Sequence, residues 1–201
     1  MTSLNEASLA LYGGEGPPLD LAGSTDNGVV MGIWDHFKIA HDPSEYARFY
    51  AIYLQRLVEN LRSERFSDGM VLPGVRQLLA KLENKGHSLG LLTGNTAAGA
   101  KEKTDYFGLS AHFSFGSYGD DHHDRNMLGP IALARAEKAT GKNFRPEETL
   151  VIGDTPKDIA CARAFGAQVV AVATGRFTSE ELAEFKPEYL CESLADWDLG
   201  V

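Results

Sequence analysis

Cysteine is scarce in this sequence of 201 residues, where it occurs only at Cys161 and Cys191, without C-x-x-C spacing. Isolated cysteines of this kind are typical of reduced thiols rather than of a disulfide framework or a zinc site. No apolar run approaches the roughly 18 residues that a membrane-spanning helix needs. Glu6 interrupts the only N-terminal stretch that could serve as a signal peptide. We therefore expect a cytoplasmic protein with no membrane partner.

Basic residues are also in the minority, because 19 Lys and Arg stand against 28 Asp and Glu, and the formal net charge is -9. Proteins that bind nucleic acids or anionic membranes draw most of their affinity from a basic surface. The charge balance therefore argues against a nucleic-acid partner. A small anionic substrate stays compatible with it, since a pocket can be locally positive in an acidic protein.

The pattern of apolar residues changes near Leu72-Pro73-Gly74. Before this point the spacing is helical, and Asp42 followed by Pro43 predicts the start of a long helix. Beyond residue 86, short apolar runs alternate with helical patterns, which predicts right-handed crossovers between parallel strands. We expect strands at 87–93, 112–116, 149–153, 168–173 and 189–191. The predicted fold class is α/β, with a parallel Rossmann-like sheet in residues 73–201 and a helical part in residues 1–72.

Ligands of parallel sheets bind at the carboxyl ends of the strands. The run that ends at Gly153 leads into Asp154 and then into Thr155 and Asp158, which occupy the N-cap and N3 positions of a predicted helix. Asp154 precedes the cap, where a carboxylate faces the cleft, and Mg²⁺ takes one or two protein carboxylates together with phosphate and water. Asp158 can equally serve only to stabilise the turn.

Two further segments carry residues suited to phosphate. Thr93, Gly94 and Asn95 end the first predicted strand, where a hydroxyl and free backbone N–H groups can hold a phosphoryl oxygen. Arg125 stands at the start of a predicted helix, from which it could clamp phosphate or simply pair with a nearby acid.

Taken together, these segments resemble the haloacid dehalogenase-like hydrolases, particularly their phosphoglycolate phosphatase-like branch. The matching stretches are LLTGN at 91–95, DRNMLGPIALARA at 124–136 and VIGDTPKDIACARAFGA at 151–167. The helical first part resembles the inserted cap of the family. The resemblance implies Mg²⁺-dependent hydrolysis of a small phosphorylated metabolite through an aspartyl-phosphate; whether the protein is a monomer or a homodimer stays open.

The resemblance also implies roles for individual residues. The phosphoryl group would be bound by Thr93, Gly94, Asn95 and Arg125. The catalytic residues would be Thr93, Arg125 and Asp158, the last supporting the metal or Arg125, and Asp154 would ligate Mg²⁺.

The nucleophile motif of the family is missing from this sequence. In the family, an Asp-x-Asp motif ends an apolar first strand, whereas residues 2–12 here resemble the helix that follows the motif. Asp20 faintly echoes it, but Ala22 stands where the second Asp belongs, and the glycine-rich residues 13–18 cannot form a buried strand. We therefore interpret Asp20 and Asp26 as loop residues of the cap.

In the family the missing strand lies between those that end here at Thr93 and Asp154. Its omission would leave a gap of about 10 Å and unpaired backbone groups that cost about 1–3 kcal/mol each. We therefore expect that the natural chain begins upstream of Met1 or has been truncated. The alternative is a pseudo-phosphatase that binds phosphate without turnover. Carbon–halogen hydrolysis, a second alternative, would need the same missing Asp.

An acidic segment and a set of aromatic residues are interpreted as structural rather than functional. Residues 120–124, Asp-Asp-His-His-Asp, look like metal ligands, but adjacent residues rarely converge on one ion, so we expect a solvated acidic loop. Aromatic residues at helical spacing in the first part are expected to form its core: Trp34, Phe37, Tyr46, Phe49, Tyr50 and Tyr53.

Overall fold

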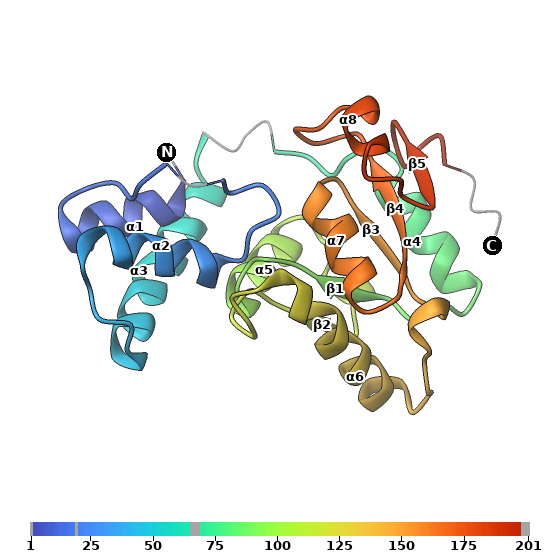
Figure 1. The fold of residues 1–201 in the computed structure, drawn as a ribbon, viewed down its shortest axis with the longest axis horizontal. Helices are drawn as coiled ribbons and strands as arrows, with labels where there is room; N and C mark the ends of the chain where they lie inside the picture. The colour runs from blue at the N-terminus through green and yellow to red at the C-terminus, as the bar shows by residue number, and fades with distance from the viewer. Residues whose placement is uncertain (1, 19, 65–68, 198–201) are drawn as a thin grey trace.

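A computed structural model describes residues 2–18, 20–64 and 69–197. The first part of the chain contains helices α1 (Ser3–Tyr12), α2 (Asp26–Phe37) and α3 (Pro43–Leu61), which lie to one side of the remainder in Figure 1. The predicted start of α3 is confirmed, because the Asp42 carboxylate accepts hydrogen bonds from the backbone N–H groups of Ser44 and Glu45. This cap satisfies donors that the helix itself leaves unpaired.

The three helices enclose an apolar cluster of their own. Its buried members all come from residues 4–61 and include Trp34, Phe49 and Tyr53. Phe37, Tyr46 and Tyr50 pack against them. The aromatic residues at helical spacing therefore form a core, as the sequence predicts.

The remainder of the chain alternates helices with short strands. The strands are β1 (Gly90–Leu92), β2 (Phe115–Ser117), β3 (Leu150–Gly153), β4 (Gln168–Val172) and β5 (Tyr189–Cys191). The helices are α4 (Val75–Asn84), α5 (Ala97–Tyr106), α6 (Leu128–Thr140), α7 (Pro156–Ala164) and α8 (Ser179–Ala183). Short 3₁₀ turns cover Ser110–His112, Arg125–Met127 and Pro146–Glu148. Every strand pair is parallel, which agrees with the expected α/β fold.

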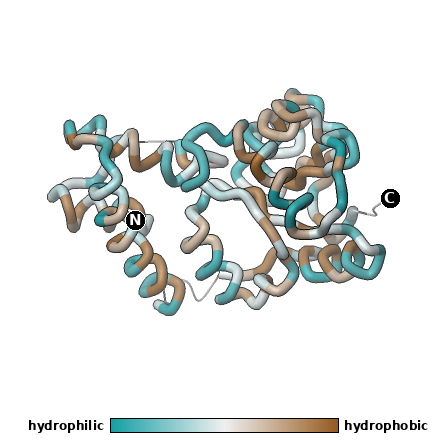
Figure 2. The backbone as a smooth tube through the Cα atoms, turned by 90° about the horizontal axis from the view of Figure 1, so that it is seen from below, coloured by the Kyte–Doolittle hydropathy of each residue, from teal (hydrophilic) through white to brown (hydrophobic). Residues whose placement is uncertain are grey.

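A second apolar cluster covers the strands of this part. It joins Val151, Val169 and Ala171 of β3 and β4 with Ile159 of α7 and Leu182 of α8. Figure 2 shows hydrophobic residues along the central strands and hydrophilic residues in the peripheral loops. Since nearly all of β4 is buried, it is covered on both faces, as is typical of parallel sheets.

One predicted strand is placed too early in the chain. His112 belongs to a 3₁₀ turn, and β2 begins only at Phe115. The backbone N–H groups of His112 and Phe113 donate to Leu109 and Ser110, and the His112 ring contacts Glu83. These local bonds close a turn where the apolar pattern alone predicts an extended chain.

The strands form two sheets, with orders β1-β2 and β3-β4-β5. Within the described residues β1 and β3 therefore do not pair with each other. Ile152, in the middle of β3, keeps 37% of its surface exposed. The interruption falls between the strands that lead to Thr93 and Asp154, where the resemblance locates the missing strand.

Candidate functional site

The ends of β1 and β3 open into a cavity of about 960 Å³ between the helical part and the α/β part. All six residues predicted to form the site line this cavity: Thr93, Gly94, Asn95, Arg125, Asp154 and Asp158. The helical part contributes Asp26, Tyr53 and Leu57 among others. The structure thus brings the predicted residues together, while their chemical roles stay predictions.

The hydroxyl of Thr93 is held by the residue two positions later. Its Oγ1 accepts hydrogen bonds from the backbone N–H of Asn95 at 3.2 Å and from the side-chain amide of Asn95 at 2.8 Å. A hydroxyl has two acceptor positions and one proton to donate. With both acceptor positions engaged, the proton is left for a partner in the cavity.

Arg125 lies in the 3₁₀ turn that precedes α6 and points its guanidinium at α7. Its Nη2 donates to Asp158 Oδ1 at 2.6 Å, and the two side chains are only 13% and 7% exposed. Arg125 Nε is buried and has no hydrogen-bond partner within the described residues. An orphaned buried donor costs about 1–3 kcal/mol, so an acceptor oxygen that reached Nε would be favoured.

Asp158 serves the turn and the arginine together. Its Oδ2 accepts from the backbone N–H of Thr155 at 3.0 Å and from the Thr155 hydroxyl at 2.7 Å, which completes a capping box on α7. The side chain packs so closely on Gly153 that a Cβ there would lie 2.4 Å from Asp158 Cβ. One oxygen of Asp158 therefore caps the helix and the other binds Arg125, while a role in catalysis stays a prediction.

Asp154 is the carboxylate best placed for a metal ion. Burial, followed by the charge of Asp158, raises its pKa. The chain passes close to it at Gly175, where a Cβ would lie 2.1 Å from Asp154 Oδ2. Over the described residues no group of three or more His, Cys, Asp or Glu could hold a metal by itself. The residues present fit Mg²⁺ in its usual mode, in which a carboxylate shares the ion with phosphate and water.

Asp26 is not the loop residue that the sequence predicts. It begins α2, is only 8% exposed, and its Oδ2 accepts from the Thr96 backbone N–H at 2.9 Å and from the Tyr53 hydroxyl at 3.1 Å. Its own N–H donates to the carbonyl of Gly94 at 2.6 Å. Burial raises the pKa of this carboxyl. Asp26 therefore joins the helical part to the loop that follows β1.

Lys103 is a site residue that the sequence analysis does not identify. It lies in α5, lines the cavity, and its Nζ donates to Asn95 Oδ1 at 2.5 Å. Burial lowers the pKa of Lys103, and the charge of Asp26 opposes this. The only sequence signal is its place two helical turns after Asn95, which many polar helix residues share.

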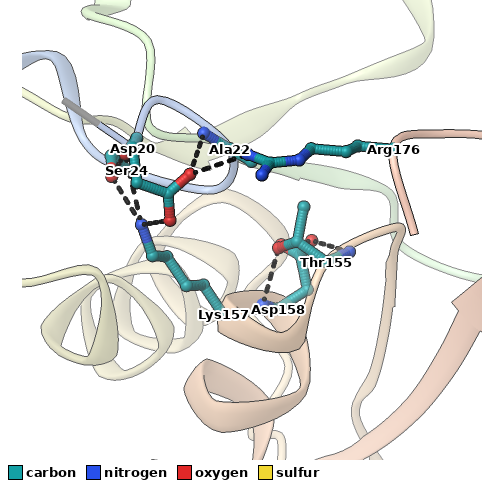
Figure 3. A network of polar contacts seen from close by, with 7 residues as sticks. All are labelled: Asp20, Ala22, Ser24, Thr155, Lys157, Asp158 and Arg176. Carbon is teal, nitrogen blue, oxygen red and sulfur yellow. Dashed lines mark hydrogen bonds and ion pairs between the residues drawn. The ribbon is translucent and has the colours of Figure 1, made fainter. Parts of the chain in front are cut away.

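Asp20 lies in a loop, as expected, and outside the main cavity. Its carboxylate pairs with Lys157 Nζ at 3.1 Å and Arg176 Nη1 at 3.4 Å, and it accepts a hydrogen bond from the N–H of Ala22 (Figure 3). The hydrogen bond and charge of Lys157 lower its pKa. These contacts occupy Asp20 at the surface and give no support to a role as nucleophile.

The acidic segment 120–124 is a loop, as the sequence predicts, and three of its five residues are exposed, but it also contacts neighbouring elements. Asp121 accepts two hydrogen bonds from the Arg135 guanidinium, at 2.5 and 2.7 Å. Asp120 accepts from the backbone N–H of Ala97 at the start of α5, at 3.0 Å. The Thr25 hydroxyl donates to the carbonyl of His123 at 2.6 Å. The segment therefore connects elements around the site.

Known proteins resemble this chain over part of its length. The family model described as HAD-hydrolase-like matches residues 127–197. A phosphoglycolate phosphatase of Mesorhizobium japonicum is 27% identical over 146 residues, which are 73% of this chain and 61% of that protein. The chain is thus similar to haloacid dehalogenase-like hydrolases. A second phosphoglycolate phosphatase, from Chromobacterium violaceum, is 28% identical over 166 residues, 79% of this chain and 72% of that protein.

Two other relatives extend the comparison. Pyrophosphatase PpaX of Oceanobacillus iheyensis is 28% identical over 125 residues, 62% of this chain and 56% of that protein. The crystal structure of CbbY from Rhodobacter sphaeroides in complex with phosphate superposes with a TM-score of 0.71 at 18% identity, over 96% of this chain and 86% of that one. The chain thus spans 61% of the Mesorhizobium japonicum protein and 56% of the Oceanobacillus iheyensis protein. No helix in the described ranges is long and apolar enough to cross a membrane.

Proposed function

We propose that this protein comes from a line of Mg²⁺-dependent phosphatases and that its described residues bind the phosphoryl group of a small phosphomonoester. The observation that carries the proposal is the meeting of three groups in one cavity: the Thr93 hydroxyl, the Arg125 guanidinium and the Asp154 carboxylate. The names of the relatives, phosphoglycolate phosphatase and pyrophosphatase, support it.

Each group would have a separate task. Thr93 and Arg125 would donate to phosphoryl oxygens, and the Arg125 charge would be held in place by Asp158. Asp154 would hold Mg²⁺ jointly with the phosphate. When bound, the ion neutralises charge on the phosphoryl oxygens.

Hydrolysis through an aspartyl-phosphate needs a further carboxylate. The acidic residues among the described lining of the cavity are Glu6, Asp26, Asp154 and Asp158. Asp26 Oδ2 accepts two hydrogen bonds. Asp158 accepts hydrogen bonds at both oxygens, and Glu6 accepts one from Asn60 Nδ2 at 2.7 Å. Asp154 is assigned to the metal ion, so these bonds leave no second carboxylate for the nucleophile among the described lining residues. Phosphate binding without turnover is therefore the second candidate function, and this observation favours it.

We extend the proposal to the whole molecule. Residues 1–72 would act as the cap and residues 73–201 as the core, which the separate apolar clusters of the two parts support. The substrate would be a small phosphorylated metabolite of the cytoplasm, bound by a monomer or a homodimer.

The test combines a binding and a turnover measurement on the same preparation. Inorganic phosphate is titrated calorimetrically with Mg²⁺ and with chelator, and hydrolysis of an aryl phosphate is followed under both conditions. We expect Mg²⁺-dependent phosphate binding that Asp154→Asn weakens and that Asp105→Asn, a change in an exposed ion pair, leaves unchanged. Chelator-sensitive turnover would establish hydrolysis, binding alone would establish the second candidate, and a folded protein that does neither would overturn the proposal.

A further inference from the structure

Lys103 introduces a cation that the phosphate site described above does not use. It lies in α5, is partly buried and lines the cavity, and its ammonium donates a hydrogen bond to Asn95. Lys101, two residues earlier on the same helix, is 72% exposed and pairs with Asp105 instead. The two lysines therefore differ in environment although they share one helix.

The contact of Lys103 fixes the orientation of the Asn95 amide. An ammonium can only donate hydrogen bonds, so the amide atom that faces it must be the oxygen. The NH₂ group of Asn95 then points the other way, and Nδ2 lies 2.8 Å from Thr93 Oγ1. Because NH₂ can only donate, Thr93 must accept there. The backbone N–H of Asn95 occupies the second acceptor position at 3.2 Å.

We propose that Lys103 is a positioning residue that acts through Asn95 and commits the Thr93 hydroxyl to donate its proton to a bound phosphoryl oxygen. The proposal rests on the proposed function, because it takes an anion in the cavity as its starting point. Without Lys103 the amide can turn over and present its oxygen to Thr93. The hydroxyl would then donate to Asn95, and its lone pairs would face the anion.

Asp26 supports this arrangement from the helical part. Its carboxylate is anchored by the Tyr53 hydroxyl and the Thr96 N–H, and its charge raises the pKa of Lys103 against the lowering caused by burial. The ammonium form, which alone is restricted to donating, is thereby favoured. The orientation of the phosphate donor thus depends on a residue of α2, which comes from the other part of the molecule.

The direct test measures phosphate affinity by calorimetry in the presence of Mg²⁺. We expect Lys103→Met to weaken binding about tenfold, the range of a hydrogen bond to a charged group. Lys101→Met is the matched control and should bind phosphate as the unchanged protein does. Lys103→Gln should retain more affinity than Lys103→Met, because its amide can still donate to Asn95. Circular dichroism checks that each variant is folded, and Lys103→Gln carries the test if Lys103→Met does not fold.

A double-mutant cycle separates the relay from a direct attraction between Lys103 and the anion. If Lys103 acts through Asn95, Lys103→Met has no further effect once Asn95→Ala is in place. An equal loss in both backgrounds would overturn the relay, as would tight binding by Lys103→Met alone. Failure of the unchanged protein to bind phosphate would overturn the proposed function as well, so the two failures are distinguishable.

Discussion

Arg125 and Asp158 form a buried ion pair that affects both the stability of the fold and the orientation of the arginine. Among the ion pairs of the described residues theirs is the least exposed, and Asp158 reaches Arg125 only because its second oxygen is fixed by Thr155. A buried pair is weak evidence for stability, but removal of one partner leaves the other charge uncompensated. The pair therefore couples the stability of the fold to the orientation of the anion-binding arginine.

We predict that Arg125→Met lowers the free energy of unfolding by about 3–5 kcal/mol, because Asp158 is then left as a buried, unpaired charge. Urea denaturation measures the change. Arg145→Met, which breaks the exposed pair with Glu148, is the control and should give no resolvable change. Equal effects of the two substitutions would contradict the role assigned to burial.

Asp26 should give the protein a distinctive pH dependence. Burial raises its pKa, so the folded protein binds this proton more tightly than the unfolded chain does. The free energy of unfolding therefore falls as the pH rises from 3.8, the ordinary pKa of an aspartate, through the raised pKa of Asp26. We predict that Asp26→Asn removes this fall, so that its stability relative to the unchanged protein improves across that window.

Asp42 provides a control of opposite sign. Its hydrogen bond from Ser44 lowers its pKa, so its contribution to stability is present above the ordinary pKa and is lost as the pH falls through the lowered one. Asn caps helices about as well as Asp. Asp42→Asn should therefore remove only the fall in the free energy of unfolding that protonation of Asp42 causes at low pH. Urea titrations between about pH 3 and 7 compare both variants; parallel curves for Asp26→Asn and the unchanged protein would refute the prediction.

Helix starts position several of the groups discussed above. Thr155 caps α7 with Asp158 as its partner, and Thr178 caps α8 with Glu181 in the same arrangement. The first box is buried beside the cavity, whereas the second lies at the surface. The same type of capping box therefore occurs once beside the candidate site and once on a peripheral helix.

Substitution of each capping threonine by alanine should affect stability and phosphate affinity differently at the two helices. We predict a loss of about 2 kcal/mol for Thr155→Ala and about 0.5 kcal/mol for Thr178→Ala, since a buried acceptor is left short of a donor only in the first. Phosphate affinity should fall for Thr155→Ala alone, because Asp158 no longer holds Arg125 firmly. Chemical denaturation and calorimetry measure the two quantities, and a matching loss of affinity in Thr178→Ala would count against the assignment.

The two parts of the molecule meet at a junction of backbone groups. Asp26 N–H donates to the Gly94 carbonyl, and a Cβ at position 94 would lie 1.9 Å from the carbonyl oxygen of Ser24. The Thr25 hydroxyl donates to the carbonyl of His123. The start of α2 therefore packs against both loops that border the cavity.

We predict that Gly94→Ala separates the helical part from the α/β part, because two backbone segments cannot retreat as a flexible side chain can. A lower Tm, weaker phosphate binding and faster proteolysis near residues 20–25 are expected. Gly86→Asn is the control, since nothing lies within 4 Å of that position and Asn tolerates its positive φ of 79°. An unchanged Tm for Gly94→Ala would show that the junction is looser than the structure indicates.

Features that depend on residues close together along the chain could be predicted from the sequence. The caps at Asp42 and Thr155 depend on partners two or three residues away. Thr93 and Asp154 each follow a strand directly, so the rule that ligands bind at the carboxyl ends of parallel strands identified them as candidates. Asp26 could not be placed in this way, because its bond to Thr96 joins residues 70 positions apart. The ordering of Asp121 by Arg135 escaped prediction for the same reason, since it depends on how α6 packs beside β2.

The α/β fold class, the change from helical spacing to alternating strands and helices near residue 72, and the candidate phosphate and metal residues could all be read from the sequence. Periodicity, helix caps and strand order depend on residues that are close along the chain. Only the tertiary structure decided that Asp26 and Lys103 belong to the site and that Asn95 faces Lys103 with its oxygen and Thr93 with its amide. These facts depend on which elements pack together, since burial and opposite charges act between residues that are close in space and remote along the chain.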